Sequence, residues 1–227
     1  MYAATLIRQF REKGERVVLE KEAKEILEAA GIPTTRCHVV DSIAQACRTA
    51  ETIGFPVVLK LSSPQLLHKS EAGGVALNLG TPQEVAAAFA RLAARGREHD
   101  PAARLLLQQM APPGVELIAG TATDPHFGTV LMLGTGGIYA ELLQDAVFRL
   151  PPLGSAEVGE MITALRGYPL LNGYRGSEKA DMAALQDTLL RLSELVCGNP
   201  EIRELDINPL VVYPRGVLAL DARLLLQ

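Results

Sequence analysis

The sequence contains no tryptophan, and phenylalanine and tyrosine together make up only 4% of its 227 residues. A folded core must therefore be aliphatic, and hydrophobic residues, at 48% of the chain, can supply it. So few rings argue against an RNA-binding module that stacks bases on exposed aromatic side chains. The formal net charge of −4 argues further against a nucleic-acid-binding surface, so we expect no nucleic-acid partner.

Cysteine is also scarce, and Cys37, Cys47 and Cys197 lie far apart in the chain. None of them forms a closely spaced pair of the kind found in zinc sites, so zinc is not expected. An odd cysteine count without a signal peptide favours a reducing compartment, and we expect a cytoplasmic location. No apolar run approaches the roughly 18 residues of a transmembrane helix, so no membrane association is expected.

The patterning of apolar residues predicts alternating helices and strands in two lobes. We expect a helical N-terminal extension over residues 1–19, a first lobe over 20–110 and a second lobe over 111–227. The hinge is placed at 110–114, because its two prolines and its glycine cannot continue a central strand. The expected class is α/β, with α+β lobes and a nucleotide-binding cleft between them.

Several local signals predict particular elements. Asp41 is expected to cap a helix that ends at Gly54, and Thr81 to begin another through a capping box with Glu84. Residues 138–143 are expected to form a strand, and 204–212 with 217–225 a terminal hairpin.

The segment from Leu67 to Gly74 is the richest in chemical information, because His68 and Lys69 precede a pair of glycines. Lysines and bare backbone suit a polyphosphate, and an imidazole can act as a nucleophile toward phosphorus. Lys60 is the only charged residue in the preceding apolar strand, Phe55–Leu61. The alternatives are an exposed loop for His68 and Lys69, and a snorkelling or ion-paired side chain for Lys60.

A second group of polar residues lies in the terminal hairpin. Alternation along a strand places Asp206 and Asn208 on the same face, and Asp221 lies on the partner strand. Two carboxylates and an amide oxygen suit Mg²⁺, which prefers oxygen ligands and retains several waters. The alternative is a polar hairpin face with a salt bridge to Arg223.

Three further features lie after the hinge, in the second lobe. Glu116 could receive a ribose or contact a metal-bound phosphate, or it could be a surface acid on an edge strand. The loop Gly134–Gly137 could cover phosphates or form a plain turn, and it is not a Walker A motif because no Gly-Lys-Ser/Thr follows. Glu141 and Asp145 could order this region or face a partner.

Taken together, these residues resemble the ATP-grasp β subunit of ADP-forming acyl-CoA synthetases, the acetate–CoA ligase (ADP-forming) family. The resemblance extends from about Glu20 to Leu225. The segments that carry it are 22–27, 54–60, 63–70, 124–128, 136–145, 173–176 and 205–210. It implies an ATP-grasp fold and the reaction acyl-CoA + ADP + phosphate ⇌ acid + ATP + CoA, with Mg²⁺ as cofactor and ATP or ADP as substrate.

The resemblance also implies roles for individual residues. His68 matches a histidine that accepts a phosphoryl group and passes it to ADP, and Asp206 matches an acid that steadies the phosphohistidine. Lys60 matches the lysine that contacts nucleotide phosphates, and Asn208 and Asp221 match metal-binding positions.

Four other residues complete the expected nucleotide site. Gln109 and Met110 lie in the segment that matches the adenine-binding hinge, and Glu116 follows it. Lys69 is expected to screen charge on the phosphoryl group together with Lys60.

The family context also implies a partner, an α subunit with CoA-binding and phosphohistidine domains, in an α2β2 heterotetramer. Two alternatives remain open at this stage. One is a β subunit of the succinyl-CoA synthetase type, which is not expected to carry a histidine at position 68. The other is a regulatory ATP-grasp module that binds nucleotide without catalysing transfer.

Overall fold

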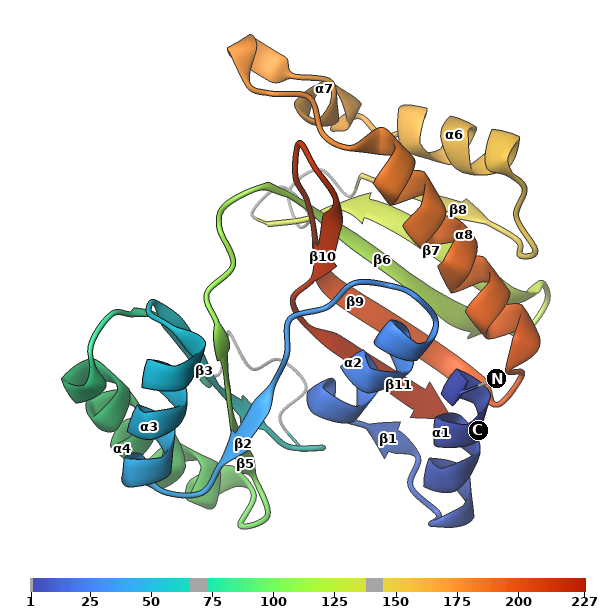
Figure 1. The fold of residues 1–227 in the computed structure, drawn as a ribbon. Helices are drawn as coiled ribbons and strands as arrows, with labels where there is room; N and C mark the ends of the chain where they lie inside the picture. Colours follow the sequence, from blue (N-terminus) through green and yellow to red (C-terminus); the bar gives the residue numbers. More distant parts are fainter. Residues whose placement is uncertain (1, 66–72, 138–144) are drawn as a thin grey trace. The chain divides into compact units, whose positions relative to one another are not determined.

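The computed structural model describes residues 2–65, 73–137 and 145–227 (Figure 1). The chain divides into two compact units. The larger unit consists of residues 1–34 and 113–227, and the smaller unit consists of residues 35–112. None of the described helices is both long and apolar enough to cross a membrane.

The smaller unit is a sheet with two helices. The described strands lie in the order β2-β5-β3-β4, and all pairs are antiparallel. Its elements are β2 (His38–Val40), α3 (Ile43–Ile53), β3 (Val57–Ser62), β4 (Val75–Leu79), α4 (Pro82–His99) and β5 (Arg104–Gln109). Leu59 and Leu61 of β3 pack in one hydrophobic cluster with Val85 and Leu92 of α4.

The larger unit is built on a sheet of seven described strands in the order β1-β11-β9-β6-β7-β8, with β10 also paired to β9. Its first elements are α1 (Tyr2–Glu12), β1 (Val17–Val18) and α2 (Glu20–Ala29). The strands and helices that follow the hinge are β6 (Val115–Asp124), β7 (Gly128–Thr135), β8 (Ala146–Arg149), α6 (Ser155–Thr163), α7 (Tyr168–Leu171), the 3₁₀ turn η1 (Tyr174–Gly176), α8 (Met182–Gly198), β9 (Ile202–Val212), β10 (Val217–Ala219) and β11 (Ala222–Leu226).

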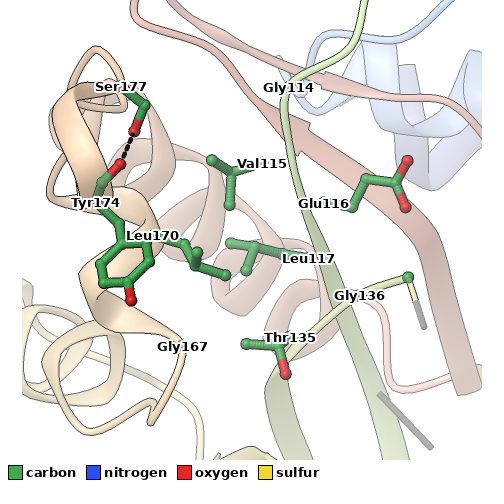
Figure 2. Close-up of a pocket in the computed structure, with 11 residues that line it drawn as sticks. Gly114, Val115, Glu116, Leu117, Thr135, Gly136, Gly167, Leu170, Tyr174 and Ser177 are labelled. Atoms are coloured by element: carbon green, nitrogen blue, oxygen red, sulfur yellow. Dashed lines mark hydrogen bonds between the residues drawn. The ribbon is translucent and has the colours of Figure 1, made fainter. Parts of the chain in front are cut away.

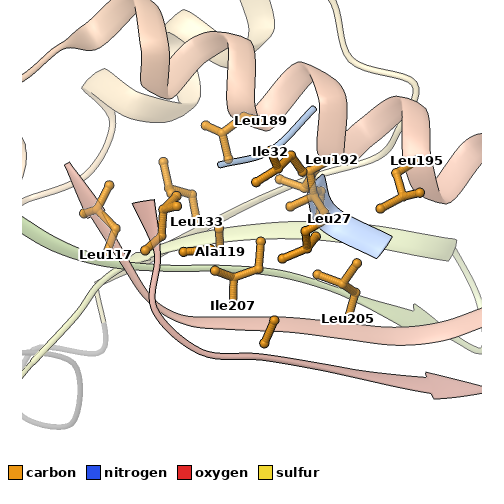
Figure 3. Close-up of a cluster of buried hydrophobic side chains, with 14 of the residues drawn as sticks. Leu27, Ile32, Leu117, Ala119, Leu133, Leu189, Leu192, Leu195, Leu205 and Ile207 are labelled. Carbon is orange, nitrogen blue, oxygen red and sulfur yellow. The ribbon is translucent and has the colours of Figure 1, made fainter. Parts of the chain in front are cut away.

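The core of the larger unit lies between this sheet and helices α2 and α8. Figure 3 shows Leu27 of α2 and Leu192 of α8 facing Leu205 and Ile207 of β9. All four side chains are almost fully buried. Because side chains alternate along a strand, Asp206 lies on the opposite face of the sheet, away from these helices. The aliphatic core expected from the composition is present.

The N-terminal residues belong to the larger unit, which differs from the expected division at residues 19 and 20. Val17 and Val18 of β1 pair with Leu225 and Leu224 of β11, and Ile26 and Leu27 are buried in the larger core. The two ends of the chain therefore join in one sheet (Figure 1). The other boundary falls between Pro112 and Pro113, inside the predicted proline–glycine segment.

Local predictions hold at some helix and strand ends and fail at others. The Thr81 capping box is present, with Pro82 in the first turn. The cap of α3 is Ser42, not Asp41, because the Ser42 hydroxyl accepts the Gln45 N–H. The predicted last strand is broken between β10 and β11 at Leu220 and Asp221. The strand predicted at 138–143 lies outside the described residues.

Two helical glycines give a stability prediction, since alanine at either position gains about 1 kcal/mol of helix propensity. In α4 a Cβ on Gly96 would lie 2.8 Å from Leu61 Cδ2 and 3.3 Å from Ala103 Cβ. Overpacking of about 1–3 kcal/mol outweighs the gain, so we expect Gly96→Ala to lower the free energy of unfolding by about 1 kcal/mol.

Gly159 in α6 is the matched control, because a Cβ there would meet nothing within 4 Å. Gly159→Ala should raise the free energy of unfolding by about 0.5–1 kcal/mol. Chemical denaturation of the two variants measures both values, and shifts of the same sign would contradict this account.

Candidate functional site

Lys60 is buried in the middle of the smaller sheet, with 6% of its surface exposed. It lies on β3 opposite Leu106 of β5 and Val75 of β4. Its strand neighbours Leu59 and Leu61 belong to the core under the helices. Lys60 therefore lies on the other face of the sheet, and its buried ammonium group is suited to bind an anionic group.

The hinge end of the smaller unit is held in place by hydrogen bonds. The Met110 N–H donates to the Pro56 carbonyl (3.0 Å). Gln108 is 3% exposed, and its Oε1 accepts bonds from the Thr35 hydroxyl (3.3 Å) and the Cys37 thiol (3.2 Å). Gln109, the last residue of β5, is exposed. The strand end next to the expected adenine-binding segment is thus rigidly attached to its own sheet.

In the larger unit the structure brings together the oxygen-bearing residues of the terminal hairpin. The Asn208 N–H donates to the Asp221 carbonyl (3.3 Å), across the break between β10 and β11. Asp206 pairs with Arg223 of β11 on one side and Gly120 of β6 on the other. Asp206 and Asp221 are half-buried and Asn208 is exposed, so all three are accessible to a ligand.

The alternative salt bridge on this hairpin does form, but with a different acid. Arg223 Nη2 lies 2.9 Å from Glu204 Oε1. Within the described residues, no cluster of three or more His, Cys, Asp or Glu side chains has metal-binding geometry. A metal at this hairpin would therefore use the Asn208 amide oxygen with the Asp221 carboxylate and complete its shell with water and phosphate oxygens, as Mg²⁺ does.

Glu116 lies on β6 opposite Val211 of β9, and its side chain is exposed. Tyr213, which comes directly after the end of β9, was not foreseen from the sequence. Burial, together with the nearby Glu116 carboxylate, raises the pKa of the Tyr213 phenol above its usual value. Gly114 is packed against this ring, because a Cβ at Gly114 would lie 2.9 Å from two ring carbons. Glu116 near the start of β6 and Tyr213 after the end of β9 therefore place an acid near a phenol.

The glycine loop predicted at residues 134–137 begins inside β7, because Gly134 and Thr135 pair with Ile118 and Leu117 of β6. A cavity of about 520 Å³ opens here, lined by Gly114, Val115, Glu116, Leu117, Thr135, Gly136, Gly137, Gly167, Leu170, Tyr174 and Ser177. Figure 2 shows Val115 and Leu117 pointing toward Leu170 and Tyr174, whereas the Glu116 carboxylate points away from them. The Gly136 N–H donates to the Glu116 carbonyl (2.9 Å), so the loop is fixed to the strand that carries the acid.

Asp145 helps to order this region, which is one of the two roles considered for it from the sequence. It is 6% exposed, and its carboxylate accepts the N–H groups of Arg166 (2.9 Å) and Gly167 (2.8 Å). His68, Lys69 and Glu141 lie outside the described residues.

A model of the ATP-grasp domain matches residues 9–226. The acetate–CoA ligase [ADP-forming] I subunit beta of Pyrococcus furiosus is 40% identical over 93% of this chain and 92% of its own length. The acetate–CoA ligase [ADP-forming] I of Archaeoglobus fulgidus is also 40% identical over 99% of this chain, which spans only 33% of that longer protein.

A more distant relative is the succinate–CoA ligase [ADP-forming] subunit beta of Ignicoccus hospitalis. It is 28% identical over 92% of this chain, which covers 55% of that protein. The acetate-type subunit is thus matched at higher identity and over nearly its full length.

Solved structures agree with this pattern. The dinucleotide forming acetyl-coenzyme A synthetase 1 of Ca. Korarchaeum cryptofilum, in complex with coenzyme A, Ca-AMPCP and HgCl+, matches with a TM-score of 0.93 at 40% identity, over 99% of this chain and 100% of that chain.

The same protein with coenzyme A and Mg-AMPPCP, its phosphohistidine segment pointing towards the nucleotide binding site, matches with a TM-score of 0.85, again at 40% identity over 99% and 100% of the two chains. The chain therefore belongs to the ATP-grasp family, among the β subunits of ADP-forming acetate–CoA ligases.

Proposed function

We propose that this chain is the nucleotide-binding β subunit of an ADP-forming acyl-CoA synthetase that acts on acetyl-CoA or a similar thioester. The reaction is acyl-CoA + ADP + phosphate ⇌ acid + ATP + CoA. The observation that carries the proposal is the grouping of Asp206, Asn208 and Asp221 on the terminal hairpin. The chain bearing this group aligns with acetate-type β subunits along nearly their whole length.

The nucleotide contacts are assigned residue by residue. Lys60, buried in an apolar strand, contacts the phosphates, and Lys69 adds a second positive charge. A cation removed from water interacts more strongly with phosphate than an exposed one does. Gln109 and Met110 offer backbone groups to the adenine, and the exposed Glu116 carboxylate accepts hydrogen bonds from the ribose hydroxyls.

The metal is assigned to Asn208 and Asp221. Both supply oxygen donors, and the backbone hydrogen bond between them holds the two residues next to each other. When bound there, Mg²⁺ would offset the negative charge of the nucleotide phosphates. Use of Mg²⁺ by this chain is supported by the Mg-AMPPCP complex of its Korarchaeum relative.

Phosphoryl transfer is assigned to His68. In the direction of ATP synthesis, the phosphorus–nitrogen bond of phosphohistidine breaks as a terminal oxygen of ADP bonds to phosphorus, and the imidazole leaves with the bonding electron pair. Lys60 and Lys69 screen the charge of the moving group. Asp206 orients the imidazole by accepting a hydrogen bond from the ring nitrogen that does not carry phosphorus.

The partner is an α chain with CoA-binding and phosphohistidine domains, in a heterotetramer. The longer Archaeoglobus relative supports this assignment, because this chain corresponds to only a third of it. The acetate type is favoured over the succinate type because the acetate-type subunits match at higher identity and over nearly their full length. A regulatory module without transfer chemistry becomes the preferred function only if His68 carries no phosphate in the complete enzyme.

The first prediction concerns His68. Incubation of the purified chain with Mg²⁺ and γ-labelled ATP should give an acid-labile, base-stable label on the protein, since phosphoramidates hydrolyse in acid. His68→Ala should abolish this label. His126→Ala is the matched control, because His126 lies in the exposed β6–β7 turn, and it should retain full labelling.

The outcomes of this experiment distinguish phosphoryl transfer through His68 from a regulatory module that binds nucleotide without transfer. If wild-type chain remains unlabelled, the experiment is repeated with the α chain added. Label that persists in His68→Ala, or unchanged turnover of that variant with the α chain, would remove His68 from the mechanism.

The second prediction concerns the metal. Loss of one carboxylate ligand in Asp221→Asn should raise the Mg²⁺ concentration required for half-maximal ADP binding about tenfold, which corresponds to about 1.4 kcal/mol. Glu204→Gln is the control on the same hairpin, because it breaks the Arg223 ion pair without removing a proposed ligand.

Titration of ADP binding against Mg²⁺ measures both variants. Equal Mg²⁺ requirements for Asp221→Asn and wild type would show that Asp221 is not a ligand. Equal increases in the two variants would assign the effect to the fold of the hairpin.

A further inference from the structure

The glycine loop, defined as Gly134–Gly137, is in direct contact with Glu116. Its Gly136 N–H donates to the Glu116 carbonyl (2.9 Å). A Cβ on Gly136 would lie 2.9 Å from the Glu116 carbonyl carbon, and one on Gly137 would lie 3.3 Å from Glu116 Oε2. The loop thus bonds to the backbone of Glu116 and lies beside its carboxylate, and its position determines the space in which that carboxylate can move.

Asp145 holds the loop from the other side. Its carbonyl accepts the Thr135 N–H (3.0 Å). Its carboxylate reaches a different element, the turn before α7, where it accepts the N–H groups of Arg166 and Gly167. A buried carboxylate with two charge-assisted hydrogen bonds is a rigid connection, because losing either bond leaves a polar group unsatisfied.

Gly167 completes the contact between turn and loop. A Cβ at this position would lie 2.2 Å from Thr135 Cγ2 and 3.3 Å from Asp145 Oδ2. The turn therefore packs directly against the loop, and the two can come this close only because residue 167 has no side chain. Asp145, Gly167 and Thr135 form one interlock, defined by these contacts.

We propose that Asp145 is a positioning residue of the nucleotide site, which holds the glycine loop against Glu116 through the interlock with Gly167 and Thr135. This inference rests on the proposed function, in which Glu116 receives the ribose. Asp145 does not itself touch the nucleotide. It acts by keeping Gly136 and Gly137 in contact with the acid that does.

The test compares Asp145→Asn with Asp181→Asn in the full-length chain. In Asp145→Asn, an NH₂ group faces one of the two backbone N–H donors and cannot accept its hydrogen bond. The loop should therefore shift, and MgADP should bind about tenfold more weakly. Asp181 is the matched control, because its carboxylate also accepts two backbone N–H groups, those of Ala184 (3.0 Å) and Gly216 (2.8 Å), outside the loop. Asp181→Asn should lower the melting temperature but leave MgADP affinity within about twofold of wild type.

A second readout does not depend on nucleotide. Hydrogen exchange of the Gly136 amide reports its bond to the Glu116 carbonyl, and it should accelerate in Asp145→Asn but not in Asp181→Asn. Unchanged exchange and unchanged affinity in a folded Asp145→Asn would overturn the inference. The same loss of affinity in Asp181→Asn would do so too, because the effect would then be general destabilisation.

A suppressor pair covers the case in which Asp145→Asn does not fold. Gly167→Ala should weaken MgADP binding by pushing Thr135 Cγ2, and adding Thr135→Ser removes that methyl group and should restore most of the affinity. Failure of the double variant to recover would contradict the interlock. If wild-type chain binds no MgADP, the proposed function fails. Hydrogen exchange of the Gly136 amide still decides whether Asp145 positions the loop.

Discussion

The antiparallel pairing of β6 with β9 is the contact on which the arrangement of the larger unit depends. β9 carries Asp206 and Asn208, and β6 carries Glu116 at the end that follows the hinge. The pairing is close at Gly120, where a Cβ would lie 2.6 Å from the Leu205 carbonyl. A side chain at this position would force the two strands apart. The register set here determines how far the acid after the hinge lies from the polar residues of the terminal hairpin.

The pairing of β6 with β9 also separates an apolar face of the sheet from the face that carries the polar residues. Leu205 and Ile207 face α2 and α8, so their burial stabilises the unit through the hydrophobic effect. Asp206 between them is turned to the opposite face, where it remains half-buried and accessible. A shift of one residue in the register would exchange these faces and bury the carboxylate, which is costly without a partner. Stability of the core and placement of the polar group thus have one cause.

Local signals in the sequence account for much of the secondary structure and for the candidate residues. The Thr81 capping box, the alternation around Asp206 and the prolines near residue 112 each act over a few residues, so they can be read without the fold. The resemblance to ATP-grasp β subunits depends on short ordered segments and was sufficient to identify the family. The cap of α3 was wrongly assigned because Asp41 and Ser42 are adjacent and both have side chains that cap helices.

The sequence by itself determined the aliphatic core, most strand and helix positions and the family of this chain. Only the tertiary structure decided that residues 1–34 join the C-terminal unit, through the pairing of Val17 with Leu225. It also decided that Asp145 reaches the Arg166–Gly167 turn, and that Arg223 pairs with Glu204. These contacts join residues far apart in the chain. Their partners depend on strand register and on close packing at glycines, which no local pattern of residues specifies.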